Sequence, residues 1–309
     1  MKILITGGSG YIGTALVPLL LERDYEVTVF DSLLFGGNAL LPFFRNPKFS
    51  FVRGDVRDRN MLEAAMKGKD VIIHLAAIVG FPACRENPQL ATTTNVDGTK
   101  NVAELAKKGQ YLLIGSTGSN YGELEDELCT EETPLRPLTI YGKTKTEAED
   151  IIMKTGQATA YRFATAFGVS PRLRLDLLIN DLTYQAVRQK YIVIYESHFM
   201  RTFIHVHDIA RSFLFAIDNK RRMLGEVYNT GDEKMNYSKR QICDIIVKKT
   251  GAYAHYAEVG EDADKRNYAV SYKKIRDVGY KTTINIDEGI DELVRALEAI
   301  KIQNPYSNV

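Results

Sequence analysis

Hydrophobic residues in the first half of the chain gather in short runs that alternate with amphipathic, helix-like stretches. The runs are apolar without strict alternation, a pattern typical of strands that are covered on both faces. They predict five strands, over Lys2–Gly7, Glu26–Asp31, Phe49–Asp55, Val71–Ala76 and Tyr111–Thr117. The stretches between them predict helices over Tyr11–Arg23, Asn60–Met66 and Asn95–Lys107. This alternation predicts an α/β fold with a doubly wound parallel sheet of the Rossmann type.

The pattern changes after about Thr165, where basic and aromatic-rich segments replace the regular alternation. A final amphipathic helix is predicted over Ile286–Ile300. We therefore expect a first domain over residues 1–165 and a smaller C-terminal α/β substrate-binding region over 166–309. The stretch Phe203–Ile217 has the pattern of an element that returns to the sheet, so part of 203–232 is expected to belong to the first domain.

Composition disfavours several classes of partner. The 309 residues include 40 basic and 39 acidic side chains, a net charge of +1, and 45% are hydrophobic. A balanced charge of this kind does not favour nucleic acid or an anionic membrane surface. The apolar runs are shorter than the ~20 residues that cross a bilayer, and the chain opens directly on a predicted strand. We expect a soluble, cytoplasmic protein.

No metal site is predicted. The three cysteines, Cys84, Cys129 and Cys243, are scattered, with no spacing typical of zinc ligands. His205 and His207 alternate in the way that a metal-binding pair does, but no third ligand accompanies them, so a packed strand end is the better interpretation. Cys84 is interpreted as a packing residue, since only Arg85 nearby would lower its pKa.

A glycine cluster, Gly7-Gly8-Ser9-Gly10-Tyr11-Ile12-Gly13, joins the first predicted strand to the first helix. In dinucleotide-binding loops the first glycine allows a tight turn, the second lets the backbone approach a pyrophosphate, and the third permits close packing. Gly7, Gly10 and Gly13 stand at these positions. A plain strand–helix turn is the alternative. The strand, the loop, the helix and an acid at Asp31 occur together, which favours the dinucleotide loop, since an acid ~20 residues on binds the adenosine ribose and disfavours the extra phosphate of NADP. NAD is the expected cofactor.

Asp55 follows the third predicted strand and has two interpretations of equal weight. One is a contact with the adenine of the cofactor. The other is the N-cap of the helix that follows.

Tyr141 and Lys145 are four residues apart, which places both on one face if the segment is helical. A tyrosine hydroxyl with a pKa of ~10 is a poor base, but an adjacent ammonium favours the phenolate. The tyrosine can then take a proton from a sugar hydroxyl. Thr117 ends the fifth strand, where its hydroxyl can hold the same sugar oxygen. A tyrosine–lysine pair of this spacing is often part of a solvated helix face. Here it indicates a catalytic site, because a dinucleotide loop and a strand that ends in a hydroxyl residue precede it.

The chain resembles the NAD-dependent epimerase/dehydratase branch of the extended short-chain dehydrogenases from Met1 to about Leu297. The motifs that carry the resemblance are GGSGYIG, GDVRD, HLAA, NVDGT, GSTGSNYG, PLRPLTIYGKTKTEAE, RTFIHVHDIA and DKRNYAVS.

The resemblance implies a role for each matching residue. Tyr141 is the general base and acid, Lys145 is its partner and also binds the nicotinamide ribose, and Thr117 is the hydroxyl residue. A nucleotide-diphosphate sugar is the implied substrate, contacted by Thr117, Tyr141, Asn180, Arg201 and Arg266. The implied NAD contacts are Gly7, Gly10, Tyr11, Ile12, Gly13, Asp31, Asp55, Val56, Ala76 and Lys145. For each arginine a surface ion pair is the alternative.

Departures from the family pattern narrow the expected chemistry. Where 4,6-dehydratases carry Asp-Glu after the threonine, this chain has Gly118-Ser119, which disfavours dehydration. Asn120 replaces the usual Val, and Thr165 stands where many epimerases have Asn. The segment Ile78–Pro88 resembles a subgroup that includes a GDP-manno-heptose 4-dehydrogenase of capsule biosynthesis. This similarity implies oxidation at C4 of the sugar.

Three reactions remain open on these residues: a 4-dehydrogenase, a 4-epimerase and a 4-keto-sugar reductase. A non-catalytic NAD-sensing protein on the same fold is a further alternative. An RNA-binding protein is a third alternative, which the sequence supports less well. By analogy with the family we also expect a homodimer that pairs the helices around Asn95–Lys107 and Tyr141–Lys154.

Overall fold

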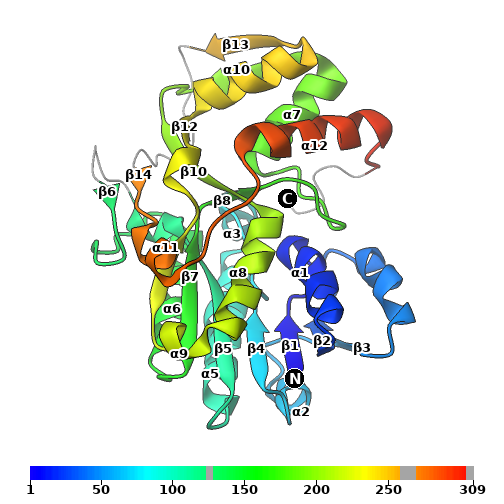
Figure 1. Ribbon diagram of the computed structural model, residues 1–309, viewed down its shortest axis with the longest axis vertical. Helices are drawn as coiled ribbons and strands as arrows, with labels where there is room; N and C mark the ends of the chain where they lie inside the picture. Colours follow the sequence, from blue (N-terminus) through cyan, green and yellow to red (C-terminus); the bar gives the residue numbers. More distant parts are fainter. Residues whose placement is uncertain (123–127, 258–268, 304–309) are drawn as a thin grey trace.

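The computed structural model describes residues 1–122, 128–257 and 269–303, and it centres on a seven-stranded sheet in which every pairing is parallel (Figure 1). The strand order is β11-β7-β5-β4-β1-β2-β3. The strands are β1 (Lys2–Thr6), β2 (Glu26–Asp31), β3 (Phe49–Arg53), β4 (Val71–His74), β5 (Tyr111–Thr117), β7 (Ala158–Phe163) and β11 (Val227–Thr230). The predicted doubly wound Rossmann sheet is confirmed. Three strands end one or two residues earlier than expected, at Thr6, Arg53 and His74.

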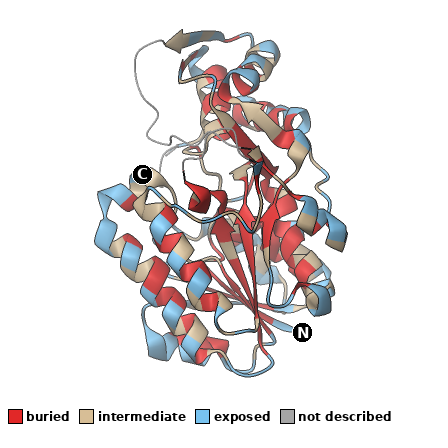
Figure 2. Cartoon of the chain, turned by 90° about the vertical axis from the view of Figure 1, so that its left-hand side faces the viewer, coloured by how far each residue is buried: buried red, intermediate tan, exposed pale blue. Residues whose placement is uncertain are grey.

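Helices cover both faces of this sheet. On one face lie α1 (Tyr11–Glu22) and α8 (Val206–Asp218), and on the other lie α2 (Arg59–Met66), α5 (Gly98–Leu105) and α6 (Ile140–Met153). The central strand shows why its sequence is continuously apolar: Ile3 and Ile5 pack with α1, while Leu4 packs under α2 and α5. All three residues are fully buried, and buried residues fill the sheet and the inner helix faces in Figure 2.

The predicted start of the helix over Asn95–Lys107 is wrong, because the helical segment begins earlier, at Pro88. It begins as α4 (Pro88–Thr92), widens into a π-helical turn, η2 (Thr93–Asp97), and continues as α5 to Leu105. Asn87 caps α4 by accepting from Leu90 N, and Pro88 occupies the first helical position. The start was missed because the extra residue of a π turn breaks the helical period.

A smaller region lies beyond the carboxyl ends of the strands. It packs α7 (Leu178–Gln189), α10 (Lys239–Thr250) and α12 (Ile286–Ala299) around a second core. Its sheets are β12-β10-β8 and the pair β13-β9, built from β8 (Thr165–Phe167), β9 (Tyr191–Tyr195), β10 (Met200–His205), β12 (Asn236–Ser238) and β13 (Tyr253–Ala257).

The stretch Phe203–Ile217 divides between the two regions. Its first residues form the end of β10 in the small mixed sheet, and the rest forms α8 against α1. The strand that returns to the large sheet is β11, which pairs with β7. On this arrangement we propose the domain division expected from the sequence, residues 1–165 with part of 203–232, and 166–309.

Short elements complete the described chain: η1 (Asn38–Arg45), α3 (Phe81–Glu86), η3 (Gly118–Tyr121), β6 (Leu128–Cys129), α9 (Lys220–Met223), η4 (Glu233–Met235), β14 (Ala269–Val270) and α11 (Lys273–Val278). Among the described residues, none of the helices has the length and apolarity that crossing a membrane demands.

Candidate active site

A cavity of about 780 Å³ lies at the carboxyl ends of the parallel strands, where ligands bind in open α/β sheets. The glycine loop forms one wall. The ends of β2, β3, β4 and β5 contribute the floor, the start of α6 adds a second wall, and the loop between β8 and α7 closes the cavity from the smaller region.

The glycine loop has the close contacts that a dinucleotide cradle needs. Gly7 has φ +71°, and a Cβ there would lie 2.5 Å from Ala76 N, so no other residue fits this turn. A Cβ on Gly13 would meet Gly8 Cα at 2.5 Å, which lets α1 start directly against the loop. Gly10 is the N-cap of α1, whose first amides and dipole suit a pyrophosphate. Gly7, Gly10, Tyr11, Ile12 and Gly13 all line the cavity, and these residues therefore fit NAD.

The loop is fastened to the smaller region by buried hydroxyls. Tyr11 Oη donates to Gly168 O at 2.7 Å, and Ser170 Oγ donates to Tyr11 O at 2.7 Å. Thr14 Oγ1 and Ser170 Oγ are also bonded at 2.9 Å. The first helix of one region thus depends on the loop after β8 for its polar partners.

Asp31, at the end of β2, lies beside the glycine loop. Its carboxylate accepts from Ser9 N at 3.0 Å and from Leu33 N at 2.8 Å, and it lines the cavity. These two bonds hold the carboxylate at the adenosine end of the loop, in the position expected for a ribose contact.

Asp55 is not a helix cap. The N-cap of α2 is Asp58, which accepts from Asn60 N and Met61 N. Asp55 instead forms a bidentate pair with Arg57, which holds the pKa of its carboxyl below the usual value. Asp55, Val56 and Ala76 line the cavity, so the cofactor contact is the interpretation that remains.

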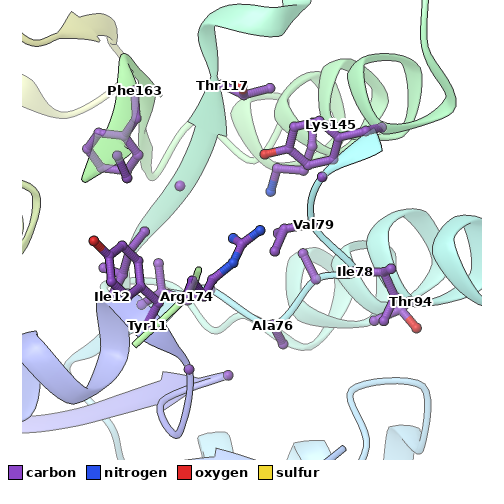
Figure 3. Close-up of a pocket in the computed structure, with 18 of the residues that line it drawn as sticks. Tyr11, Ile12, Ala76, Ile78, Val79, Thr94, Thr117, Lys145, Phe163 and Arg174 are labelled. Atoms are coloured by element: carbon purple, nitrogen blue, oxygen red, sulfur yellow. The ribbon is translucent and has the colours of Figure 1, made fainter. Parts of the chain in front are cut away.

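Thr117, Tyr141 and Lys145 line the same cavity from β5 and α6. Figure 3 shows Thr117 and Lys145 on the cavity wall. The pair on α6 is not a solvated helix face, because Lys145 is only 5% exposed. Thr139 caps the helix by accepting from Gly142 N, so α6 begins immediately before the tyrosine. Thr117 Oγ1 accepts from Ser119 N at 3.1 Å and donates to Ser119 Oγ at 3.2 Å, which fixes its rotamer at the strand end.

The charge state of Lys145 is set by opposing effects. Burial lowers its pKa from 10.5 to about 8, while the carboxylate of Glu149, one turn further along α6, acts to raise it. The lysine therefore remains an ammonium at neutral pH and lies close to releasing its proton.

Sequence reasoning did not single out Arg174 and Asp176, two of the charged residues that line the cavity. Arg174 and Asp176 form a bidentate pair at 3.1 and 2.5 Å, and both are almost buried. Figure 3 shows Arg174 projecting into the cavity between the glycine loop and Lys145. The segment SPRLRLD carried a signal, since two arginines and an aspartate at alternate positions within an apolar run are costly to bury without a role.

The three predicted substrate contacts from the smaller region have different outcomes. Arg201, on β10, lines the cavity. Asn180 does not: it is fully buried, its Oδ1 accepts from Gly168 N at 2.9 Å, and its Nδ2 donates to Arg174 O at 2.8 Å. It holds the loop that carries Arg174. Arg266 lies outside the described residues.

Asn95 is a further residue that sequence reasoning did not single out. It lies in the π turn, where Oδ1 accepts from Ile78 N at 2.7 Å and Nδ2 donates to Ile78 O at 3.0 Å and Thr144 Oγ1 at 3.0 Å. It thereby joins the loop after β4 to the catalytic face of α6. The motif NVDGT was the available signal.

The two packing interpretations can be compared with the structure directly. Cys84 is fully buried, and burial raises the pKa of its thiol to about 11. His205 is also fully buried, bonded to Glu292 Oε2 at 2.7 Å and accepting from His207 N as the cap of α8. Within the described ranges, no three His, Cys, Asp or Glu side chains are grouped as metal ligands.

A dinucleotide loop and a tyrosine–lysine pair share one cavity on a Rossmann fold, an arrangement that suits an NAD-dependent enzyme. The chain belongs to the NAD dependent epimerase/dehydratase family, whose model matches residues 3–231. It is therefore an NAD-dependent enzyme, and the expectation from the sequence is confirmed.

Similar proteins span almost the whole chain. A Methanocaldococcus jannaschii protein named as a candidate UDP-glucose 4-epimerase is 30% identical, over 94% of this chain and 97% of its own. A dTDP-glucose 4,6-dehydratase from Bacillus anthracis, solved with NAD, has a TM-score of 0.84 at 27% identity and covers 97% of both chains. A UDP-glucuronic acid 4-epimerase from Bacillus cereus has a TM-score of 0.86 at 25% identity, over 97% of this chain and 99% of its own.

Proposed function

We propose that the enzyme oxidises the C4 hydroxyl of a nucleotide-activated sugar, as a 4-dehydrogenase or a 4-epimerase in the synthesis of surface polysaccharides. The observation that carries the proposal is the convergence of Thr117, Tyr141 and Lys145 on the cavity that the glycine loop also lines. The names of the similar proteins, two of which refer to 4-epimerases, support chemistry at C4.

The residues of the chain divide the work of proton transfer. Tyr141, as phenolate, removes the proton of the C4 hydroxyl, and Thr117 holds the same oxygen through its own hydroxyl. The Lys145 ammonium stabilises the Tyr141 phenolate before the proton transfer. It also binds the nicotinamide ribose beside it. NAD, when bound, supplies the hydride acceptor for C4. The walls of the cavity exclude water from the reacting atoms.

The substrate diphosphate is proposed to lie toward the smaller region. Arg172, Arg174 and Arg201 line the cavity on that side, and guanidinium groups form strong paired bonds with phosphate oxygens. We expect Arg266 to add a further contact, as the family resemblance implies. No contact to the substrate is proposed for the Asn180 side chain, because its amide is occupied within the protein.

Dehydration is not proposed. The two residues after Thr117 are Gly118 and Ser119, and the Ser119 hydroxyl is bonded to Thr117. Neither supplies the carboxylate that removal of a C5 proton and loss of the C6 hydroxyl require. The proposed reaction therefore stops at the 4-keto sugar or continues by reduction of the ketone.

The deciding experiment is to incubate the purified enzyme with UDP-, GDP-, CDP- and dTDP-sugars, including UDP-glucuronic acid, and to follow NADH absorbance and products. Net NADH with a 4-keto product identifies a 4-dehydrogenase. Interconversion of two sugars without net NADH identifies a 4-epimerase. A 4-keto sugar that is consumed only when NADH is added identifies a reductase. No turnover and no NADH with any sugar, while NAD remains bound, would contradict the proposal and favour an NAD-sensing protein.

A further inference from the structure

A buried polar network lies on the inner face of α6, beyond the catalytic pair. The carboxylate of Glu149 accepts from Arg162 Nη2 at 2.6 Å and from Arg162 Nε at 3.0 Å. Ser116 Oγ donates to it at 2.5 Å, and Asn120 Nδ2 donates to it at 3.1 Å. Each of the four residues is at most 7% exposed, so the hydrogen-bond donors of the carboxylate are all buried protein groups.

Asn120 is the unexpected member of this network. It is fully buried, and its Nδ2 bridges Ser116 Oγ and Glu149 Oε2, at 3.1 Å to each. Its Oδ1 has no hydrogen-bond partner in the described structure. Flipping the amide would place an oxygen against the Glu149 carboxylate, so the unsatisfied carbonyl is a consequence of donating to Glu149. The valine usual in the family would carry no such cost.

Glu149 lies one helical turn after Lys145 on α6, and its carboxylate acts to raise the pKa of the lysine. The groups that interact electrostatically with that lysine are Glu149 on its own helix, Cys84 on α3 and His74 on β4. Tyr141 and Arg174 line the same cavity, and Arg162 on β7 is bonded to Glu149. Burial lowers the pKa of His74 to about 3 and raises the pKa of Cys84 to about 11, so both are uncharged at neutral pH.

We propose that Asn120 is a positioning residue for catalysis, which by donating to the Glu149 carboxylate limits how strongly this carboxylate holds the proton on Lys145. The inference rests on the proposed function, in which Lys145 assists Tyr141. Asn120 touches neither the cavity nor the reacting groups and acts through Glu149.

The direction of the effect follows from the dipole of the amide. Its N–H directs positive charge at Glu149 and partly offsets the field of the carboxylate at Lys145. Replacing Asn120 with valine removes this donor, so the carboxylate attracts the ammonium more strongly. The titration midpoint of Lys145 should rise by roughly half a pH unit. The decline of kcat at alkaline pH should move upward by the same amount.

The test is the variant Asn120→Val, studied by NMR of the enzyme labelled with [13Cε]lysine, with the Lys145 signal assigned from Lys145→Met. The matched control is Asn236→Val on β12, because Asn236 Oδ1 is also buried without a partner. A raised Lys145 midpoint in Asn120→Val, with the wild-type midpoint in Asn236→Val, is the expected result. An unchanged midpoint in Asn120→Val would overturn the inference.

Stability separates positioning from a purely structural role. Asn120→Val gives up the hydrogen bonds to Ser116 and Glu149 but also removes an unsatisfied carbonyl, so its melting temperature should stay close to that of the wild type. A lower melting temperature with an unchanged Lys145 midpoint indicates a structural role and overturns the inference. If Asn120→Val does not fold, Ser116→Ala removes another donor from the same carboxylate and should raise the midpoint likewise. The NMR titration needs no substrate, so failure of every sugar in the panel would count against the proposed function alone.

Discussion

The ammonium of Lys145 and the carboxylate of Glu149 lie one turn apart on the buried face of α6, and neither residue is more than 5% exposed. The carboxylate of Glu149 is bonded to Arg162, which is its principal partner. Its negative charge still acts to raise the pKa of Lys145. Because Arg162 is the main partner of Glu149, the buried ammonium of Lys145 stays available to Tyr141.

Lys145 should make the free energy of unfolding depend measurably on pH. Its pKa is about 8 in the folded protein and near 10.5 when unfolded. Between these values the unfolded chain binds a proton that the folded chain has released, so the free energy of unfolding rises with pH. Below pH 8 both states hold the proton and the contribution is constant. Relative to Lys145→Met, the cofactor-free wild type should gain about 3 kcal/mol across this window.

Urea denaturation of both proteins at several pH values would measure this difference. Turnover should move in the opposite direction, falling above pH 8 as Tyr141 loses its charged neighbour. A stability difference that stays flat from pH 8 to 10.5 would contradict the lowered pKa.

Tyr141→Phe should abolish proton transfer and leave binding intact. We expect kcat to fall by about 10²–10⁴-fold, with little change in NAD affinity, since the ring remains and only the hydroxyl is lost. Single-turnover absorbance of NADH gives the rate, and calorimetry gives the affinity. Tyr195→Phe, at an exposed position on β9, is the matched control and should retain full activity. Equal losses in both variants would exclude a special role for Tyr141.

The buried pair of Arg162 and Glu149 should matter more to stability than a surface pair on the same helix. Arg162→Met leaves a buried carboxylate without its main partner and should cost about 3–5 kcal/mol. Lys154→Met removes the exposed partner of Asp150 and should cost under about 1 kcal/mol. Chemical denaturation of the two variants measures both values. Similar costs would show that the buried pair is not a structural requirement.

Asp31 should govern the choice between NAD and NADP. Asp31→Asn keeps an acceptor for only one of the two amides, Ser9 N or Leu33 N, and removes the charge that repels a 2′-phosphate. We expect the preference for NAD over NADP to fall by at least about tenfold, which corresponds to ~1.4 kcal/mol. Binding of both cofactors, followed by fluorescence, tests this. An unchanged ratio would show that another group excludes the phosphate.

We propose a homodimer through α5 and α6, and the exposed residues of these helices give it a specific signature. They are charged residues of both signs, Lys100, Glu104, Lys143, Glu147 and Asp150, with Lys154 at the C-cap of α6. Such a face relies on ion pairs more than on apolar contact, so the dimer should dissociate progressively as salt increases. Sedimentation at low and high ionic strength would show this. A monomer at micromolar concentration in low salt would refute the dimer.

Local patterns were sufficient for the elements whose signal is contained within a few residues. The apolar runs predicted β1 to β5, and the glycine spacing predicted the loop that lines the cavity. The patterns did not show which residues distant in the chain become hydrogen-bond partners. Asn180 matches a substrate contact in sequence, yet its amide is occupied by Gly168 and Arg174, and only the folded loop shows this. The π turn was missed for the related reason that its extra residue is stabilised by Ile78 and Thr144, not by its own segment.

The bonds between Tyr11 and the loop at Gly168 and Ser170 also bear on how the protein forms during synthesis. The first helix leaves the ribosome early, but the groups that satisfy its buried hydroxyls are made more than 150 residues later. The covering helix α8 follows later still. A nascent chain that ends near residue 165 therefore contains six strands of the sheet but an incompletely anchored cofactor loop. Tight NAD binding should accordingly be a property of the finished polypeptide and not of its first half.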